Sequence, residues 1–112
     1  MNELEQLHGK IIQFRDERNW QQFHNPKDLA LSLSLEASEL LELFQWKTSE
    51  EAVEKNLDKM KDELADVLIY AVLFANETKI DIIKAIKEKI EKNEINYPKE
   101  KSLGKKDKYT LL

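Results

Sequence analysis

Apolar residues recur every three or four positions along most of the chain, which is the spacing of one face of an α-helix. The pattern predicts four helices, over about 3–19, 26–46 and 49–78, and from residue 82 to just before Pro98. No segment sustains the alternation of apolar and polar residues that marks a half-buried strand. Four helices with short connections and no strand pattern favour an all-α, four-helix-type bundle.

Capping residues stand at the predicted helix starts. Asn25 precedes Pro26, and proline suits a first helical position because an N–H there would have no partner. Thr48 and Glu51 have capping-box spacing, and Asp81 can cap the fourth helix. The third helix is long enough to bend near its middle.

The second predicted helix carries carboxylates among leucines. On a helical wheel, 26–46 is apolar on almost every side, and one arc forms a core stripe of Leu29, Leu33, Ala37, Leu40 and Phe44. Glu36 and Glu39 lie one turn apart on one face, flanked by further leucines. Glu42 instead falls on the polar side with serines, so only the first two acids need a special explanation.

The third predicted helix repeats this arrangement. Glu63 and Asp66 are again three residues apart, with Tyr70 one turn further on, and neither acidic face contains Lys or Arg. Unpartnered buried carboxylates are costly, so the two pairs predict a bound cation between two helices. Oxygen ligands suit Mg²⁺ or Mn²⁺. Two unrelated, solvated acidic pairs are the alternative reading.

Composition narrows the chemistry. The 112 residues correspond to about one domain, and 36% are charged, with only two glycines and two prolines, which favours helix. Absence of cysteine excludes disulfides, thiol nucleophiles and zinc fingers. His8 and His24 do not follow a glutamate at di-iron spacing, which disfavours iron. With no membrane span or signal peptide in the pattern, we expect a cytoplasmic protein with no membrane partner.

Charge is unevenly distributed. The net charge is −4, yet the segment from Lys84 to Lys108 is locally basic. Such a segment can bind nucleic acid, neutralise the phosphates of a small ligand, or simply be solvated. We expect a helical domain over 1–97 and an irregular basic tail over 98–112.

The acidic motifs resemble a known family signature, Glu-Glu-x-x-Glu on one helix and Glu-x-x-Asp on a later one. Here 35–39 reads Leu-Glu-Ala-Ser-Glu and 63–66 reads Glu-Leu-Ala-Asp, so Leu35 replaces the leading glutamate. This signature belongs to the MazG-like all-α nucleoside triphosphate pyrophosphohydrolases, and the chain is similar to their dCTP pyrophosphatase branch. The similarity also covers segments elsewhere, in the same order and at similar spacing: 15–33, 44–47, 62–72 and 89–98.

The resemblance implies hydrolysis of nucleoside triphosphates, dCTP or modified pyrimidine dNTPs, to the monophosphate and pyrophosphate, as nucleotide-pool house-cleaning. It implies Mg²⁺, with Mn²⁺ as a substitute, bound by Glu36, Glu39, Glu63 and Asp66. Either Glu36 or Glu39 would be the catalytic base. The implied substrate-binding residues are Trp20, His24, Trp46, Tyr70, Lys89, Asn93, Tyr97, Lys108 and Tyr109.

The resemblance also implies partners. MazG-like enzymes are dimers or dimers of dimers, so a second copy of the chain is expected, with a nucleoside triphosphate as substrate and no nucleic acid. Two alternatives stay open. One is a relative acting on dUTP or phosphoribosyl-ATP, which the aromatic residues around 20–24 and 44–46 disfavour. The other is a non-enzymatic helical interaction module that uses the acids as a docking surface.

Overall fold

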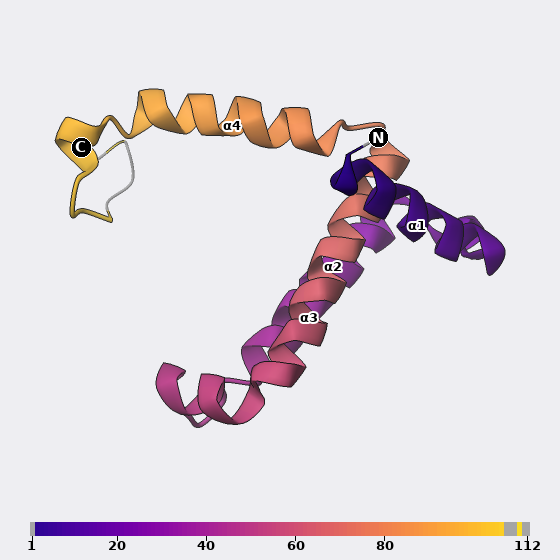
Figure 1. Ribbon diagram of the computed structural model, residues 1–112, viewed down its shortest axis with the longest axis horizontal. Helices are drawn as coiled ribbons and strands as arrows, with labels where there is room; N and C mark the ends of the chain where they lie inside the picture. The colour runs from indigo at the N-terminus through magenta and orange to yellow at the C-terminus, as the bar shows by residue number, and fades with distance from the viewer. Residues whose placement is uncertain (1, 107–109, 111–112) are drawn as a thin grey trace. The chain divides into compact units, whose positions relative to one another are not determined.

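The computed structural model describes residues 2–106 and 110, and the regular elements in this part of the chain are all helical (Figure 1). The all-α prediction is therefore confirmed. In chain order the elements are α1 (Glu3–Glu17), the 3₁₀ helix η1 (Trp20–Phe23), α2 (Pro26–Glu42), α3 (Ser49–Thr78), α4 (Ile82–Asn96) and α5 (Lys99–Ser102).

The predicted caps form at the starts of α2, α3 and α4. Each cap provides a side-chain oxygen that accepts a hydrogen bond from the backbone N–H three residues on, which satisfies a donor of the first turn. The pairs are Asn25 with Asp28 (2.9 Å), Thr48 with Glu51 (3.1 Å) and Asp81 with Lys84 (3.1 Å).

Helix ends differ from the prediction. α1 ends at Glu17, two residues early, and Asn19 then adopts a left-handed conformation (φ 52°) that turns the chain into η1. α2 ends at Glu42 rather than at Trp46. The backbone N–H groups of the next three residues bond three residues back instead of four, and Trp46 itself has φ 63°. Because of this tighter turn, Trp46 does not continue the helical spacing of α2, and its position cannot be read from a helical wheel.

A kink divides α3 nearer its start than its middle. Asn56 has non-helical backbone angles (φ −122°, ψ 19°), and its Nδ2 donates to the carbonyl oxygen of Leu43 at 3.2 Å. Leu43 stands at the end of α2, where a carbonyl oxygen has no hydrogen-bond partner within its own helix. The bend therefore forms where a side chain of α3 can cap α2.

The chain divides into two compact units, residues 1–79 and 80–112. In the first, α2 and α3 lie side by side and antiparallel, with Leu29 and Ala52 fully buried (Figure 1). α1 joins α3 through Arg15, which is 5% exposed and donates from Nη1 to Asn76 Oδ1 at 3.0 Å.

The second unit contains α4 and α5. The predicted division into a helical domain (1–97) and an irregular tail (98–112) stays a prediction, although α5 is a helical turn within that tail. Within the described part of the chain, no helix combines the length and apolar character needed to cross a membrane.

Candidate metal and nucleotide site

Three of the four predicted ligands meet between α2 and α3. Glu36 and Glu39 come from α2 and Glu63 from α3, and one carboxylate oxygen of each lies within 4.8 Å of those of the other two. Asp66 follows Glu63 by one turn of α3 and lines the pocket described below. We call Glu36, Glu39 and Glu63 the acid cluster.

Two oxygens of the acid cluster are buried without a hydrogen-bond partner. They are Oε2 of Glu36 and Oε2 of Glu63, whereas Glu39 and Glu42 are exposed. Among the described residues, no ion pair reaches the acid cluster or Asp66. A buried carboxylate oxygen with no partner is costly, so the cluster lacks the compensation that a cation would provide.

Two carboxyl groups of the acid cluster, those of Glu36 and Glu63, have raised pKa values. Burial raises the pKa of Glu36 from its ordinary 4.5 to about 7, reinforced by a hydrogen bond with Glu39 and by the negative charges of Glu39, Asp66 and Glu63. The pKa of Glu63 is also raised, first by a hydrogen bond with Glu39 and then by burial. Without a cation, Glu36 and Glu63 therefore retain protons at pH values where an ordinary glutamate has lost them.

The donor set fits a hard divalent cation, because all its donors are carboxylate oxygens. Bonds of about 2.1 Å to octahedral Mg²⁺ place neighbouring oxygens about 3 Å apart and opposite ones about 4 Å apart. The observed spread of up to 4.8 Å is close to this range.

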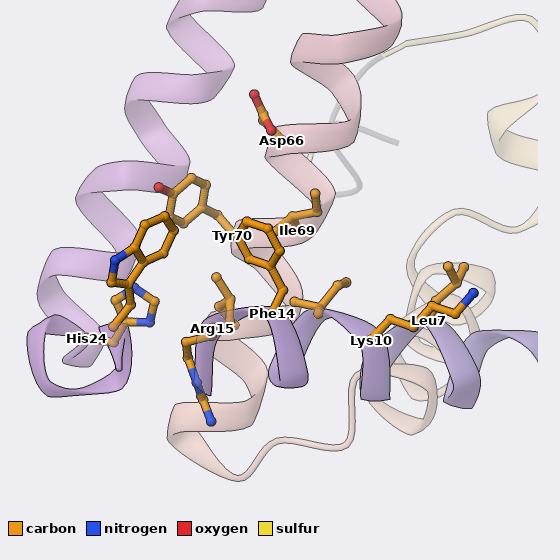
Figure 2. A pocket seen from close by; sticks show the side chains of 11 residues that line it. Leu7, Lys10, Phe14, Arg15, His24, Asp66, Ile69 and Tyr70 are labelled. Atoms are coloured by element: carbon orange, nitrogen blue, oxygen red, sulfur yellow. The ribbon is translucent and has the colours of Figure 1, made fainter. Parts of the chain in front are cut away.

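A pocket of about 400 Å³ lies next to the acid cluster, among α1, η1 and the C-terminal half of α3 (Figure 2). It brings together four predicted site residues: Trp20, His24, Asp66 and Tyr70. In Figure 2, Asp66 lies one turn along α3 from Tyr70, on the side away from Arg15. A volume of this size is typical of small-molecule sites.

His24 contributes a neutral imidazole to this pocket. Burial lowers its pKa from 6.5, helped by the nearby positive charge of Arg15 and opposed by Glu77. Its Nδ1 is buried and has no hydrogen-bond partner. The ring is therefore uncharged at pH 7, and it can donate or accept but not neutralise a phosphate.

The sequence reasoning missed seven of the eleven residues that line the pocket, among them Lys10, Phe14 and Arg15. Phe14 resembled an ordinary member of the apolar stripe of the first helix, yet its side chain is 51% exposed. In Figure 2 the Phe14 ring points from α1 toward the space that Tyr70 faces, while the Arg15 guanidinium points away from the rings. No local pattern signals that α1 packs on α3, so none could have identified this wall.

Trp46 does not enter the pocket of its own chain. Trp20 and His24 precede the first residue of α2, whereas Trp46 follows the last, and a 17-residue helix spans about 25 Å. Its side chain is 92% exposed. Its predicted contact with the nucleotide stays a prediction.

Other predicted binding residues lie in the second unit or outside the described residues. Lys89 and Asn93 are on α4, and Tyr97 is its C-terminal cap. Their relation to the acid cluster stays a prediction. Lys108 and Tyr109 lie outside the described residues.

Comparison with known proteins identifies the family. A family model described as MazG-like matches residues 31–112, which include the acid cluster and Asp66. The chain belongs to the MazG-like family. The resemblance inferred from the acidic motifs is thus confirmed.

Relatives of this MazG-like chain agree in sequence and fold. It is 40% identical to dCTP pyrophosphatase 1 of Rattus norvegicus and 38% identical to that of Homo sapiens, in each case over 97% of this chain and 67% of the relative. A crystal structure of a pyrophosphatase from Archaeoglobus fulgidus superposes with a TM-score of 0.82 at 42% identity, covering 88% of this chain and 94% of that one.

Proposed function

We propose that this chain is a Mg²⁺-dependent nucleoside triphosphate pyrophosphohydrolase. Its substrate is dCTP or a modified pyrimidine dNTP, and its products are the nucleoside monophosphate and pyrophosphate. The acid cluster carries the proposal, because two of its buried oxygens lack partners next to a pocket of nucleotide size. Identity of about 40% to dCTP pyrophosphatase 1 supports the same reaction.

Glu36, Glu39, Glu63 and Asp66 hold the metal in this proposal. Divalent-metal dependence is what the pyrophosphatase relatives imply, and Mg²⁺, with Mn²⁺ as a substitute, suits oxygen ligands. When bound, Mg²⁺ neutralises phosphate charge and lowers the pKa of water. The carboxylates alone would repel a triphosphate, so substrate binding depends on the cation.

Hydrolysis requires a proton acceptor and a leaving group. Water attacks the α-phosphorus, the bond to the bridging oxygen breaks, and pyrophosphate leaves with the electron pair. Glu36 or Glu39 accepts the proton of the attacking water. The reaction forms no covalent intermediate, in keeping with a chain that has no cysteine.

The pocket holds the base and sugar. Trp20 and Tyr70 offer aromatic rings, and His24 offers an uncharged polar edge. Stacking of a base on an aromatic side chain contributes about 1–3 kcal/mol. The remaining predicted substrate-binding residues stay part of this proposal: Trp46, Lys89, Asn93, Tyr97, Lys108 and Tyr109.

We infer that the protein works as a dimer or a dimer of dimers. Several leucines of the α2–α3 pair are more than half exposed, among them Leu35 (63%), Leu41 (69%) and Leu68 (59%). An apolar surface of this kind is typical of an interface. A second copy of the chain would cover it and would offer Trp46 a partner.

A pyrophosphate-release screen tests the function. Purified protein with Mg²⁺ is offered dCTP, 5-modified dCTPs, dUTP, the other dNTPs and the ribonucleotides. We expect the highest kcat/KM with a cytosine or modified pyrimidine dNTP. A preference for dUTP would support the alternative substrate, and a folded protein inactive on every nucleotide with Mg²⁺ and Mn²⁺ would refute the proposal.

A further inference from the structure

An aromatic corner forms one wall of the pocket where α1 gives way to η1. The ring of Phe14 meets that of Trp20 edge-to-face, with centroids 5.7 Å apart and an interplanar angle of 74°. Both side chains line the pocket, and both remain about half exposed, at 51% and 45%. Aromatic surface left open inside a pocket is available to a planar ligand.

Arg18 holds this corner from outside the pocket. Its guanidinium carbon lies 3.6 Å from the centroid of the Phe14 ring and 6.0 Å from that of Trp20. Its Nη1 also donates to the carbonyl oxygen of Phe14 at 3.0 Å. One planar cation therefore contacts both rings and the last turn of α1.

The backbone explains why such a support is needed. Arg18 is the C-terminal cap of α1, and the left-handed Asn19 follows it before η1 begins at Trp20. The two rings thus stand on different elements joined by a sharp turn. Backbone hydrogen bonds from Arg18 to Arg15 (3.2 Å) and from Asn19 to Asp16 (3.0 Å) hold the turn, and the side chain of Arg18 links the two rings across it.

We propose that Phe14 contacts the base of the bound nucleotide and that Arg18 is a positioning residue, which holds Phe14 edge-on to Trp20. This deepens the proposed function, on which it rests. In the alternative role, Arg18 would attract the phosphates of the nucleotide through its positive charge. The two roles predict different effects on ligand affinity.

The test compares ligands with different numbers of phosphates. Affinity for deoxycytidine and dCMP is measured from Trp20 fluorescence in a Trp46→Phe background, and KM and kcat are measured for dCTP. Arg18→Ala should weaken binding of all three ligands by the same factor, about two- to fivefold, and leave kcat little changed. Phe14→Leu should weaken all three by about tenfold.

Two control variants and a melting measurement show whether a loss of affinity comes from the planar shape of Arg18, from its charge or from altered folding. Arg18→Lys keeps the charge but lacks the planar face, so it should not restore affinity. Lys59→Ala removes an exposed positive charge of α3 and should leave all three ligands unaffected. The Mg²⁺-induced rise in melting temperature should be the same in the Arg18 variants as in the wild type, because the acid cluster is intact.

A loss that grows with the number of phosphates and is absent for deoxycytidine, or full recovery in Arg18→Lys, would refute the positioning role. Unchanged affinity in Phe14→Leu would refute base contact. Both tests require that the wild-type protein hydrolyses dCTP. If the wild type shows no turnover, the proposed function is refuted instead.

Discussion

The two tryptophans of the chain were predicted to share one role, and the fold gives them different surroundings. Trp20 lies where η1 approaches α1 and faces a pocket with Phe14 beside it. Trp46 lies in the turn after α2 and is 92% exposed. The acid cluster stands between these two regions, on the facing surfaces of α2 and α3.

This difference shows which of the two regions a single chain can cover without a second copy. Packing of α1 on α3 encloses the Trp20 region, whereas the described chain offers the Trp46 side chain almost no cover. Trp46 has a left-handed backbone conformation (φ 63°). This conformation costs a bulky residue about 1–2 kcal/mol, and strain of this kind clusters at functional sites. We interpret the Trp20 region as a base pocket and the Trp46 region as a surface awaiting a second copy.

The largest expected effect concerns the acids between the two regions. Glu39→Gln or Asp66→Asn should lower kcat/KM more than about a hundredfold, because even residues that only support metal ligands cost about 10–100-fold. Glu42→Gln, three residues from Glu39 on the exposed side, should keep nearly full activity. Equal losses in Glu39→Gln and Glu42→Gln would show that the helix faces are assigned wrongly.

Stability of the metal-free protein should depend on pH. The pKa of Glu36 is higher in the folded chain, about 7, than its ordinary 4.5, so the folded state binds this proton more tightly. This contribution is fully present below about pH 4.5 and is lost as the pH rises through about 7. Thermal melting in chelator should therefore show a falling melting temperature across this window.

Added Mg²⁺ should raise the melting temperature most above pH 7, where Glu36 no longer holds its proton. Glu36→Gln should flatten the pH dependence in chelator, whereas Glu42→Gln should not. If the metal-free wild type and Glu36→Gln show the same change of melting temperature between pH 5 and 7, the raised pKa of Glu36 is contradicted.

Replacement of each tryptophan in turn tests whether the two regions have different roles. Trp46→Ala should raise the KM for dCTP about fivefold or more with a smaller change in kcat, if a base stacks on it. As an exposed residue, it should alter the unfolding free energy of the isolated chain by no more than about 0.5 kcal/mol. Quenching of Trp46 fluorescence by dCTP in a Trp20→Phe background reports the contact.

Trp20→Ala, by contrast, should raise KM and also lower the melting temperature, since this ring packs on Phe14. For Trp46, the opposite outcome is a large fall in the melting temperature of Trp46→Ala together with no quenching of Trp46 fluorescence at saturating dCTP. That outcome would make Trp46 a structural residue.

The smallest expected effect concerns the support of the Trp46 turn. Asn56→Ala removes the donor to the Leu43 carbonyl and should cost about 1 kcal/mol of stability. The looser turn should raise the KM about twofold without changing kcat. Asn56→Asp keeps the size but lacks the Nδ2 donor, so it should behave like Asn56→Ala. Wild-type behaviour of Asn56→Asp would show that the hydrogen bond does not hold the turn.

Features set by neighbouring residues could be predicted from the sequence. Asn25 and Thr48 begin helices because their side chains satisfy nearby N–H groups, and Glu36 and Glu63 face inward because helical spacing puts them there. Features set by distant contacts could not. The end of α2 depends on the kinked Asn56 in α3, thirteen residues from Leu43.

The pocket wall is the clearest case of such a distant contact. Phe14 becomes a pocket residue only because α1 is joined to α3, partly through Arg15 and Asn76, which are 61 residues apart. Periodicity shows that both helices exist but not that these faces meet. The acids of each helix could be recognised from the spacing within that helix, whereas the pocket beside the acid cluster depends on the packing of α1 against α3.

Identification of the products formed from dCTP, with and without a chelator, tests the proposed Mg²⁺-dependent hydrolysis. With Mg²⁺, we expect phosphorus NMR to show dCMP and pyrophosphate in equal amounts, no turnover in excess chelator, and full recovery when Mg²⁺ is restored. Release of orthophosphate as the first product, or full turnover in excess chelator, would rule out a metal-dependent pyrophosphohydrolase.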